Sequence, residues 1–335
     1  MLAWLVAAVT VRSLLLPPHA TIDPFGSRAL MSASSSGQFA ATVTIRGFVQ
    51  RVLLWQHGGY TLPDPRPAAV AGFDVNGALL VNAEVPERVF GQNVVPVDMR
   101  SCENFPQRSA GPALAGALSD GSLIATMQSP PIVDLDDASG QYAPVVLHLR
   151  SDQCLNMGNG VAFGTAGLYS VGYTAYMGSI PAPSNVTSER ERFMAMRWHE
   201  RTREPLGDGV ALAVNAAGNA AGANVPPGKG AAFNAAPHAR AWLTGAATPL
   251  ELASNAPLSV AYAIDDRNRV AGMLEDGRGR HFAFVWQNGI MRRLDDVVHV
   301  PGWRFECAYA FAPDDGIAGI GVYRGRGAAF VVTGL

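Results

Sequence analysis

The chain has 335 residues, of which 16% are charged, and its formal net charge is −2. A nearly neutral chain without a basic stripe is not expected to bind nucleic acid or acidic membranes. Its 36 glycines and 23 prolines indicate many tight turns rather than long helices. No C-x-x-C or Cys/His spacing is present, so we predict no structural zinc ion and no other metal or cofactor.

The N-terminal segment, residues 1–27, admits two interpretations. Residues 1–16 are apolar apart from Thr10, Arg12 and Ser13, and they are too few to span a bilayer comfortably. In the first interpretation they form the core of a secretory signal, although a basic start is missing and a good cleavage site is absent near Ala20.

In the second interpretation the same segment carries a strand of a repeat. Ala3-Trp4-Leu5 followed by residues 10–14 has the spacing of residues 283–285 followed by 290–294 in the clearest repeat unit. We favour this interpretation, and we expect residues 28–335 to form the repeat domain proper. Whether residues 1–20 are removed stays open at this stage.

Four weak copies of the unit occupy the first half of the chain. Their first strands begin near residues 29, 73, 117 and 162, and each is followed by a turn centred on a glycine. The turn residues recur about every 40 to 51 residues, a period that is typical of solenoids, propellers and arrays; they are Gly37, Gly77, Gly121, Gly167, Gly218 and Asn268.

The second half holds three clearer copies. Residues 211–222 align without a gap on residues 261–272, and a third copy begins near residue 309. The best preserved unit, residues 258–297, reads as four short strands with polar turns, and its Asn288-Gly289 pair is a strong hairpin signal.

Together the copies predict an all-β protein, a single β-propeller of seven four-stranded blades. The seventh copy ends at Leu335, where its fourth strand should begin, so the strand near residues 10–16 is expected to complete the last blade. Closure of this kind protects sheet edges, whereas an open solenoid needs polar caps that the apolar termini do not supply. The weakness of the first copies leaves six blades as an alternative count.

Aromatic residues on the third strands are expected to form the core between blades. They are Trp55, Trp198, Trp242 and Trp286, with Phe90 and Phe330 at related positions.

The best unit resembles the HAF repeat, a family named for its His-Ala-Phe triplet. The stretch here is His281-Phe282-Ala283-Phe284, one residue longer, and the last copy has Ala328-Ala329-Phe330 without the histidine. The resemblance implies an extracellular or periplasmic propeller-like repeat protein, and it implies no catalytic residues.

The cysteines leave one pairing open. Cys102 and Cys154 fall near the ends of successive fourth strands, so they can pair in an exported protein, but three separate thiols, including Cys307, fit the sequence equally well.

Function is predicted from the loops, since no catalytic constellation is apparent. The long segments all belong to the connections between second and third strands or between blades, which share one face of a propeller; they are 101–112, 129–143, 174–192, 224–238 and 295–305. We therefore expect a non-catalytic, monomeric binding protein that engages a protein or glycan through segments 129–143, 174–192 and 224–238, without membrane insertion.

The alternative is a hydrolase or lyase with its site at the mouth of the central channel, where residues of several blades converge. The carboxylates of residues 134–140 suggest a cation loop, but a solvated loop is the simpler interpretation.

Overall fold

Strands dominate the computed structural model, whose single described helix is α1 (Leu294–Val297). The structure describes the whole chain except residues 1–8, 15, 23–30, 47–48, 57–58, 64–65, 92, 100–101, 103–111, 128–143, 152, 181–187, 225–235, 247 and 254, and of residues 175–192 it describes side chains at no position. Among the described residues, no helix is long and apolar enough to cross a membrane.

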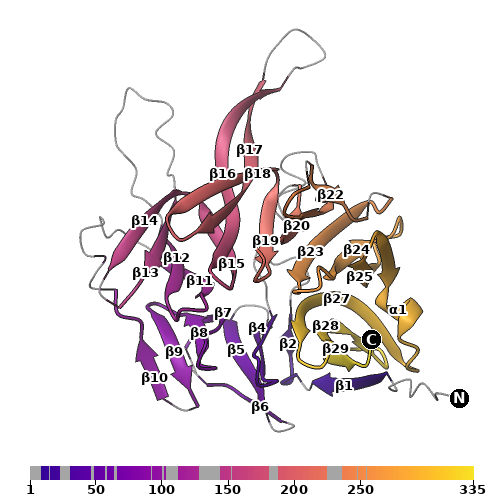
Figure 1. Cartoon of the computed structure of the whole chain (residues 1–335). Coiled ribbons are helices and arrows are strands. Elements are labelled where there is room, and N and C mark those ends of the chain that lie inside the picture. The colour runs from indigo at the N-terminus through magenta and orange to yellow at the C-terminus, as the bar shows by residue number, and fades with distance from the viewer. Residues whose placement is uncertain are drawn as a thin grey trace, which may run out of the picture.

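The strands form seven antiparallel sheets, and the colours of Figure 1 run in order around the ring that they make. Each sheet is one blade, numbered here by the position of its first strand. The first four blades comprise β2–β6 (Ala20–Thr21, Met31–Ala33, Phe39–Ile45, Val49–Gln56, Gly59–Thr61), β7–β10 (Ala69–Phe73, Leu79–Asn82, Pro86–Phe90, Asn93–Pro96), β11–β14 (Ala113–Ala117, Leu123–Met127, Val145–Leu149, Cys154–Asn159) and β15–β18 (Val161–Ala166, Tyr169–Ile180, Ser188–His199, Thr202–Asp208).

The last three blades comprise β19–β22 (Val210–Val214, Ala220–Ala223, Ala239–Trp242, Leu250–Glu251), β23–β26 (Leu258–Ile264, Val270–Glu275, His281–Gln287, Ile290–Arg293) and β27–β29 (Trp303–Ala312, Gly316–Tyr323, Arg326–Thr333) together with β1 (Thr10–Leu14). The predicted all-β propeller with seven four-stranded blades is therefore confirmed. Only blade 1 departs from four strands, because β2 and β3 pair with opposite ends of β4.

The ring closes through its two ends, as predicted. Strand β1 pairs antiparallel with β29, from Thr10 opposite Thr333 to Leu14 opposite Ala329. Figure 1 shows the indigo β1 beside the yellow blade 7. The surplus strand expected at Ala3 to Leu5 lies outside the described residues. The pairing gives β29 a neighbour on the side that an open array would leave as a free edge.

A short polar turn joins the first two strands of most blades. In blade 6 the Asp265 carboxylate accepts hydrogen bonds from the backbone N–H groups of Arg267 and Arg269, at 3.1 and 2.8 Å. Asn215 makes the same turn in blade 5, and Asp74 makes it in blade 2. A side chain that accepts hydrogen bonds from the backbone of its own turn stabilises the turn locally, so in these blades the turn stays short.

The Ala-Gly signature of the second strands has a steric cause. A Cβ atom on Gly272 would lie 2.0 Å from the carbonyl oxygen of Val260, and one on Gly222 would lie 1.9 Å from that of Val210. The first and second strands approach so closely there that only glycine fits.

The core lies between blades, and the four predicted tryptophans are all buried in it, as is Phe330. Phe90 was predicted to join them, and that prediction is wrong: its side chain is 44% exposed. Phe90 is the last residue of β9 and pairs with Asn93 across the tight turn to β10, so it lies at the end of the blade rather than between sheets.

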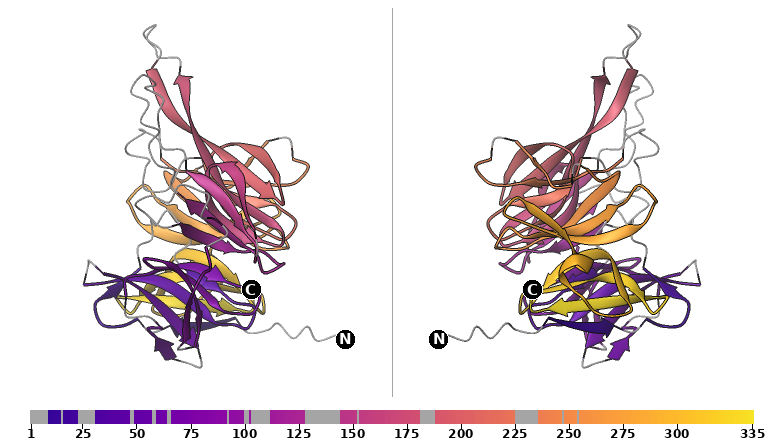
Figure 2. Two further views of the ribbon diagram at one scale, coloured as in Figure 1. Left: turned by 90° about the vertical axis from the view of Figure 1, so that its left-hand side faces the viewer. Right: turned by 90° about the vertical axis from the view of Figure 1, so that its right-hand side faces the viewer.

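Segment 174–192 was predicted as a long loop, and that prediction is also wrong. Strands β16 and β17, with twelve residues each, continue through most of it in one register, from Tyr169 opposite His199 to Ile180 opposite Ser188. The hairpin projects from the ring in Figures 1 and 2. In the projecting part each strand pairs with the other on its inner edge, and the outer edges are left to solvent.

Candidate functional site

The central cavity is the candidate site. It has a volume of about 420 Å³, and the first strands of all seven blades line it. Ser34, Asp74, Val75 and Ser119 also line it, and these residues belong to the turns between first and second strands. The cavity therefore opens on the face that carries these short turns, which we call the short-turn face.

The shape of the cavity depends on one residue in the first strand of each of blades 2 to 7. In blades 2 to 7 a β-bulge leaves one residue of the first strand unpaired, and this residue lines the cavity. Blades 4 to 7 place large side chains there: Phe163, Leu212, Tyr262 and Tyr309.

Blades 2 and 3 place only Ala71 and Ala115 at the same level. A Cβ atom on the neighbouring Gly72 would meet nothing within 4 Å, whereas one on Gly116 would meet the Thr165 hydroxyl at 2.2 Å. The free space of the cavity thus borders blade 2, because its wall residues are small.

The cavity wall is almost uncharged. Among the described residues that line it, Asp74 is the only charged one. One oxygen of its carboxylate accepts two turn hydrogen bonds of 2.9 Å, and the other lies 3.6 Å from Nε of Arg88. The remaining polar groups of the described lining are hydroxyls, those of Ser32, Ser34, Ser35, Ser119 and Thr165 and the phenols of Tyr262 and Tyr309. Such a wall suits apolar groups and a few hydrogen bonds, and its described residues offer neither a second carboxylate nor a histidine beside Asp74.

A second cavity, the outer groove, lies between blades 2 and 3. Its volume is about 640 Å³, and it is lined by the outer strand of blade 2 and by turns of blade 3. Two arginines, Arg88 and Arg150, and two aspartates, Asp98 and Asp120, share its wall with Phe90 and Val95.

A serine, a histidine and an aspartate meet beside this groove. Ser122 Oγ donates to Asp120 Oδ1 at 2.5 Å and lies 2.7 Å from His148 Nε2. Because a carboxylate only accepts, the serine proton points at Asp120, and His148 Nε2 must donate to the serine.

This order differs from that of a nucleophilic triad, in which the histidine takes the serine proton and the aspartate orients the histidine. Burial, followed by the charge of Arg150, lowers the pKa of His148, so the ring is neutral near pH 7. Burial raises the pKa of Asp120, but its hydrogen bonds from Ser122 and the nearby charges outweigh burial and lower it. We interpret the cluster as structural: its hydrogen bonds hold β13 against the turn between β11 and β12, and it is not a reaction centre.

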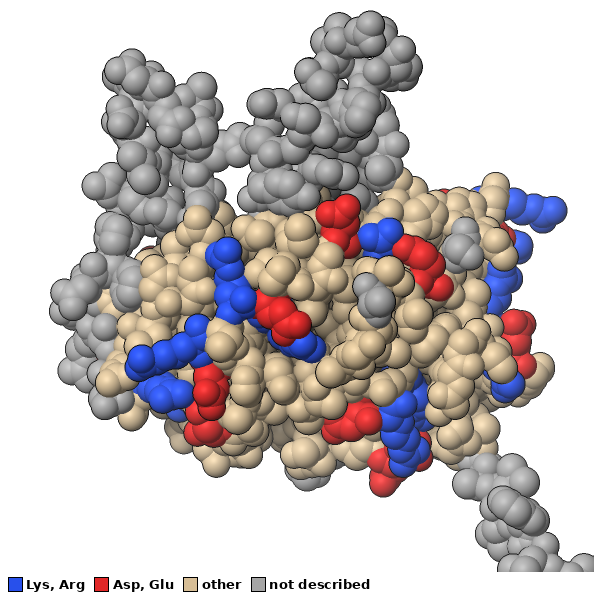
Figure 3. Space-filling view, turned by 45° about the horizontal axis from the view of Figure 1, so that its top comes forward, with Lys and Arg blue, Asp and Glu red and all other residues tan. Residues whose placement is uncertain are grey.

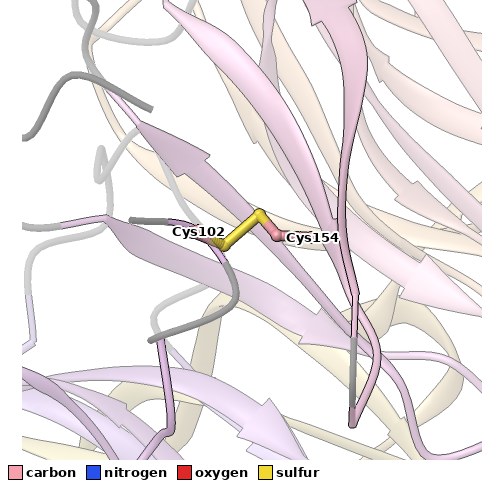
Figure 4. The surroundings of a disulfide bond; sticks show 2 residues. All are labelled: Cys102 and Cys154. Atoms are coloured by element: carbon pink, nitrogen blue, oxygen red, sulfur yellow. A yellow bond between two sulfur atoms is a disulfide. The ribbon is translucent and has the colours of Figure 1, made fainter. Parts of the chain in front are cut away.

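The disulfide that the sequence left open is present. Cys102 and Cys154 are bonded, with their Cα atoms 5.1 Å apart (Figure 4). The bond joins the connection between blades 2 and 3 to β14, the outer strand of blade 3. Cys307 is a buried thiol, and burial raises its pKa far above the usual range.

The predicted binding segments fall largely outside the described residues. This holds for all of 129–143, including the carboxylates of 134–140, and for most of 224–238. Both segments connect second to third strands, on the face opposite the short-turn face. The mouth of the central channel was named only for the alternative enzyme, and the side of the cavity that stays free was not predicted. It depends on which blades carry small residues at the bulge, and the signal for it is the alanines and glycines of residues 71–72 and 115–117.

Charges of both signs are interspersed on the face in Figure 3, without a continuous area of one sign. Among the described residues, no three His, Cys, Asp or Glu side chains gather as a metal site requires.

Neither protein-family models nor curated proteins match the sequence. Solved structures do match: the β-propeller domain of the Trilobed protease from Pyrococcus furiosus is 9% identical over 90% of this chain and 93% of that one, with a TM-score of 0.55. Pyrococcus horikoshii acylaminoacyl peptidase is 9% identical over 86% and 48%, with a TM-score of 0.54. YCF48 bound to D1 peptide is 15% identical over 97% and 94%, with a TM-score of 0.50. At these identities the likeness shows the fold alone: this chain is a seven-bladed β-propeller.

Proposed function

We propose that the chain is a non-catalytic binding propeller that holds part of a protein or glycan partner in the central cavity. The observation that carries the proposal is the cavity itself, about 420 Å³ and walled by all seven blades with a single engaged carboxylate. This volume lies in the range of ligand sites, and its mixture of apolar wall and few hydroxyls is typical of binding rather than of acid–base catalysis.

The fold does not choose between binding and catalysis, since the compared propellers include two peptidases as well as YCF48 with its D1 peptide. The choice rests on chemistry. A hydrolase or lyase at the channel mouth needs two carboxylates, or a histidine and an aspartate, in reach of each other. Among the described lining residues, Asp74 is the one titratable carboxylate, and its hydrogen bonds hold it in the turn.

The opposite face is a second proposed contact surface. The hairpin of β16 and β17 projects from the ring in Figure 1, and segments 129–143 and 224–238, like the tip of this hairpin, connect second to third strands in the sequence. A hairpin that projects from a rigid ring gives a partner protein an accessible binding surface.

An oxidising compartment is part of the proposal. The Cys102–Cys154 disulfide supports an extracellular or periplasmic location, because disulfides persist there and are rare in a reducing cytosol. The HAF-like residues of blade 6 point the same way. We further propose a monomer, which the molar mass from light scattering tests directly.

Filling the cavity tests the proposal. Ala71→Phe places in blade 2 a ring like the one that Phe163 supplies at the same level of blade 4. The variant and the wild type are compared on a glycan array and on a displayed library of random twelve-residue peptides. Val85→Phe, at an exposed position of the same blade on the other face, is the matched control.

Selected ligands are expected to lose binding to Ala71→Phe and to keep binding to Val85→Phe. Ligands that bind Ala71→Phe like the wild type and fail on Val85→Phe would refute the cavity and favour the opposite face. Thermal unfolding of both variants verifies that they fold.

A further inference from the structure

Exposed apolar side chains are concentrated on blade 2. Of the nine large hydrophobic residues that are exposed among the described residues, four belong to this blade. Val85 lies on the opposite face. The other three, Val75, Phe90 and Val95, are 53%, 44% and 49% exposed and line the central cavity or the outer groove. Exposed apolar area that gathers in one place marks interaction sites more often than scattered single residues do.

The central cavity and the outer groove share a wall. Val75 lines the cavity, and its side chain lies 3.7 Å from where a Cβ atom of Gly121 would be; Gly121 lines the groove. The ion pair of Asp74 with Arg88, at 3.6 Å, likewise joins one residue of the cavity wall to one of the groove wall. An apolar track therefore leads from the cavity across Val75 to Phe90 and Val95.

The free space of the cavity lies at the inner end of this track. Ala71 and Gly72, which border it, belong to the same blade as the three exposed side chains. The small wall residues and the exposed apolar residues are independent features of the sequence, and the fold brings them together on the short-turn face.

The charges along the track are of both signs. The outer groove has two arginines and two aspartates, and Asp74 of the cavity wall lies beside Arg88. A strongly charged ligand would meet a like charge near each opposite one and would gain little from such a wall.

We infer that the occupant of this site is an extended peptide segment of a partner protein, which inserts one large apolar side chain into the central cavity and lays a second against Phe90 and Val95. Three strand spacings, about 14 Å, separate β7 at the cavity from β10 at the groove, and the side chains on one face of an extended chain recur about every 7 Å, so anchors about four residues apart reach both hollows. The groove wall also exposes polar groups, those of Asp98, Asp120 and Arg150, but a glycan bound to them would leave Val75, Phe90 and Val95 without an apolar partner. The inference rests on the proposed function, since it names the ligand class of the same cavity.

The experiment selects peptides from a displayed library of random twelve-residue sequences on the whole wild-type chain. Enriched peptides are synthesised, and their Kd values are measured on the wild type, on Val75→Ser, on Phe90→Ser and on the control Val85→Ser. Val85 is exposed to a similar extent on the same blade, so its substitution removes a comparable apolar surface from the opposite face.

The expected result is an enriched pattern of two large apolar residues with short spacing. Val75→Ser and Phe90→Ser should each weaken binding at least about fivefold, and Val85→Ser should change it less than about twofold. Because all three sites are exposed, the variants are expected to fold, and unchanged thermal midpoints verify this.

Two outcomes would overturn the inference while the proposed function stands. One is glycan binding that Ala71→Phe abolishes, without any enriched peptide. The other is peptide binding that Ala71→Phe abolishes but that neither Val75→Ser nor Phe90→Ser weakens. If no ligand of either class is lost on filling the cavity, the proposed function itself fails.

Discussion

Removal of the Cys102–Cys154 disulfide should lower the stability of the propeller by an amount that follows from the chain length it closes. The two residues are 52 positions apart. In the chain-entropy description, closing a loop of this length in the unfolded state contributes about 4 kcal/mol at 25 °C. Native cross-links deliver about 2 to 4 kcal/mol in practice, so we expect the double variant Cys102→Ser/Cys154→Ser to lose that much.

The loss converts into a measurable shift of the thermal midpoint. The unfolding entropy of a 335-residue chain is about 0.7 kcal/mol per kelvin at the midpoint, so 2 to 4 kcal/mol corresponds to about 3 to 6 °C. Calorimetry of the wild type and of the double variant, both without reductant, gives the shift. Dithiothreitol should lower the midpoint of the wild type to that of the variant and leave the variant unchanged, because its remaining cysteine, Cys307, is already a thiol.

Counting the free thiols tests whether Cys102 and Cys154 form the disulfide. Unfolded wild type without reductant should expose one reactive thiol, that of Cys307, and the reduced chain should expose three. Equal midpoints for the wild type and the double variant, with one thiol counted in the wild type, would refute the link between loop length and stability. A count of three thiols would refute the disulfide.

Three further predictions concern the ring itself. Gly272→Ala should cost at least about 3 kcal/mol or prevent folding, because its Cβ would overlap backbone, while Gly277→Ala, in open space, should be nearly neutral in the same thermal melts. Asn268→Gly keeps the left-handed turn but removes the acceptor that Asn215 and Asn219 of blade 5 share, at 2.9 and 2.7 Å; denaturant titration should show a loss of about 1 to 3 kcal/mol. Because burial lowers the pKa of His148 below its usual 6.5, the unfolded chain binds this proton more readily; stability should fall as the pH drops below about 6.5, and midpoints of His148→Gln measured from pH 7 to pH 5 should fall less.

The parts of the fold that the sequence predicts are those that local chemistry specifies. The polar turns of blades 5 and 6 close through their own side chains, so Asn215 and Asp265 mark them without reference to the rest of the chain. Gly222 and Gly272 are fixed by contact with the adjacent strand of the same blade. Because turn residues recur about every 40 to 51 residues, counting the copies predicted seven blades and the closing strand, with six blades left as the alternative count.

What the sequence did not predict depends on contacts between distant parts. The 174–192 segment has no partner in the repeat pattern, yet its two arms pair with each other for the full length of β16 and β17. Phe90 matches an aromatic position by alignment, but the early turn at Gly91 places it at the end of the blade rather than between sheets. The disulfide needed the distance between two chain segments, which 52 positions of sequence do not reveal.

The central cavity depends on both local sequence and distant contacts, because it forms between blades at positions where the repeat has diverged. The clearest copies place Leu212, Tyr262 and Tyr309 at the bulge and fill their part of the channel, and the rings of the two tyrosines lie 5.0 Å apart. Blades 2 and 3, among the weakest copies, place Ala71 and Ala115 there and leave a hollow. A ring of seven identical copies would fill its channel symmetrically, so a one-sided site requires some blades to differ. Divergence that weakens the repeat signal therefore coincides with the position of the site, and the poorly matching copies of such a chain are where a ligand should be sought first.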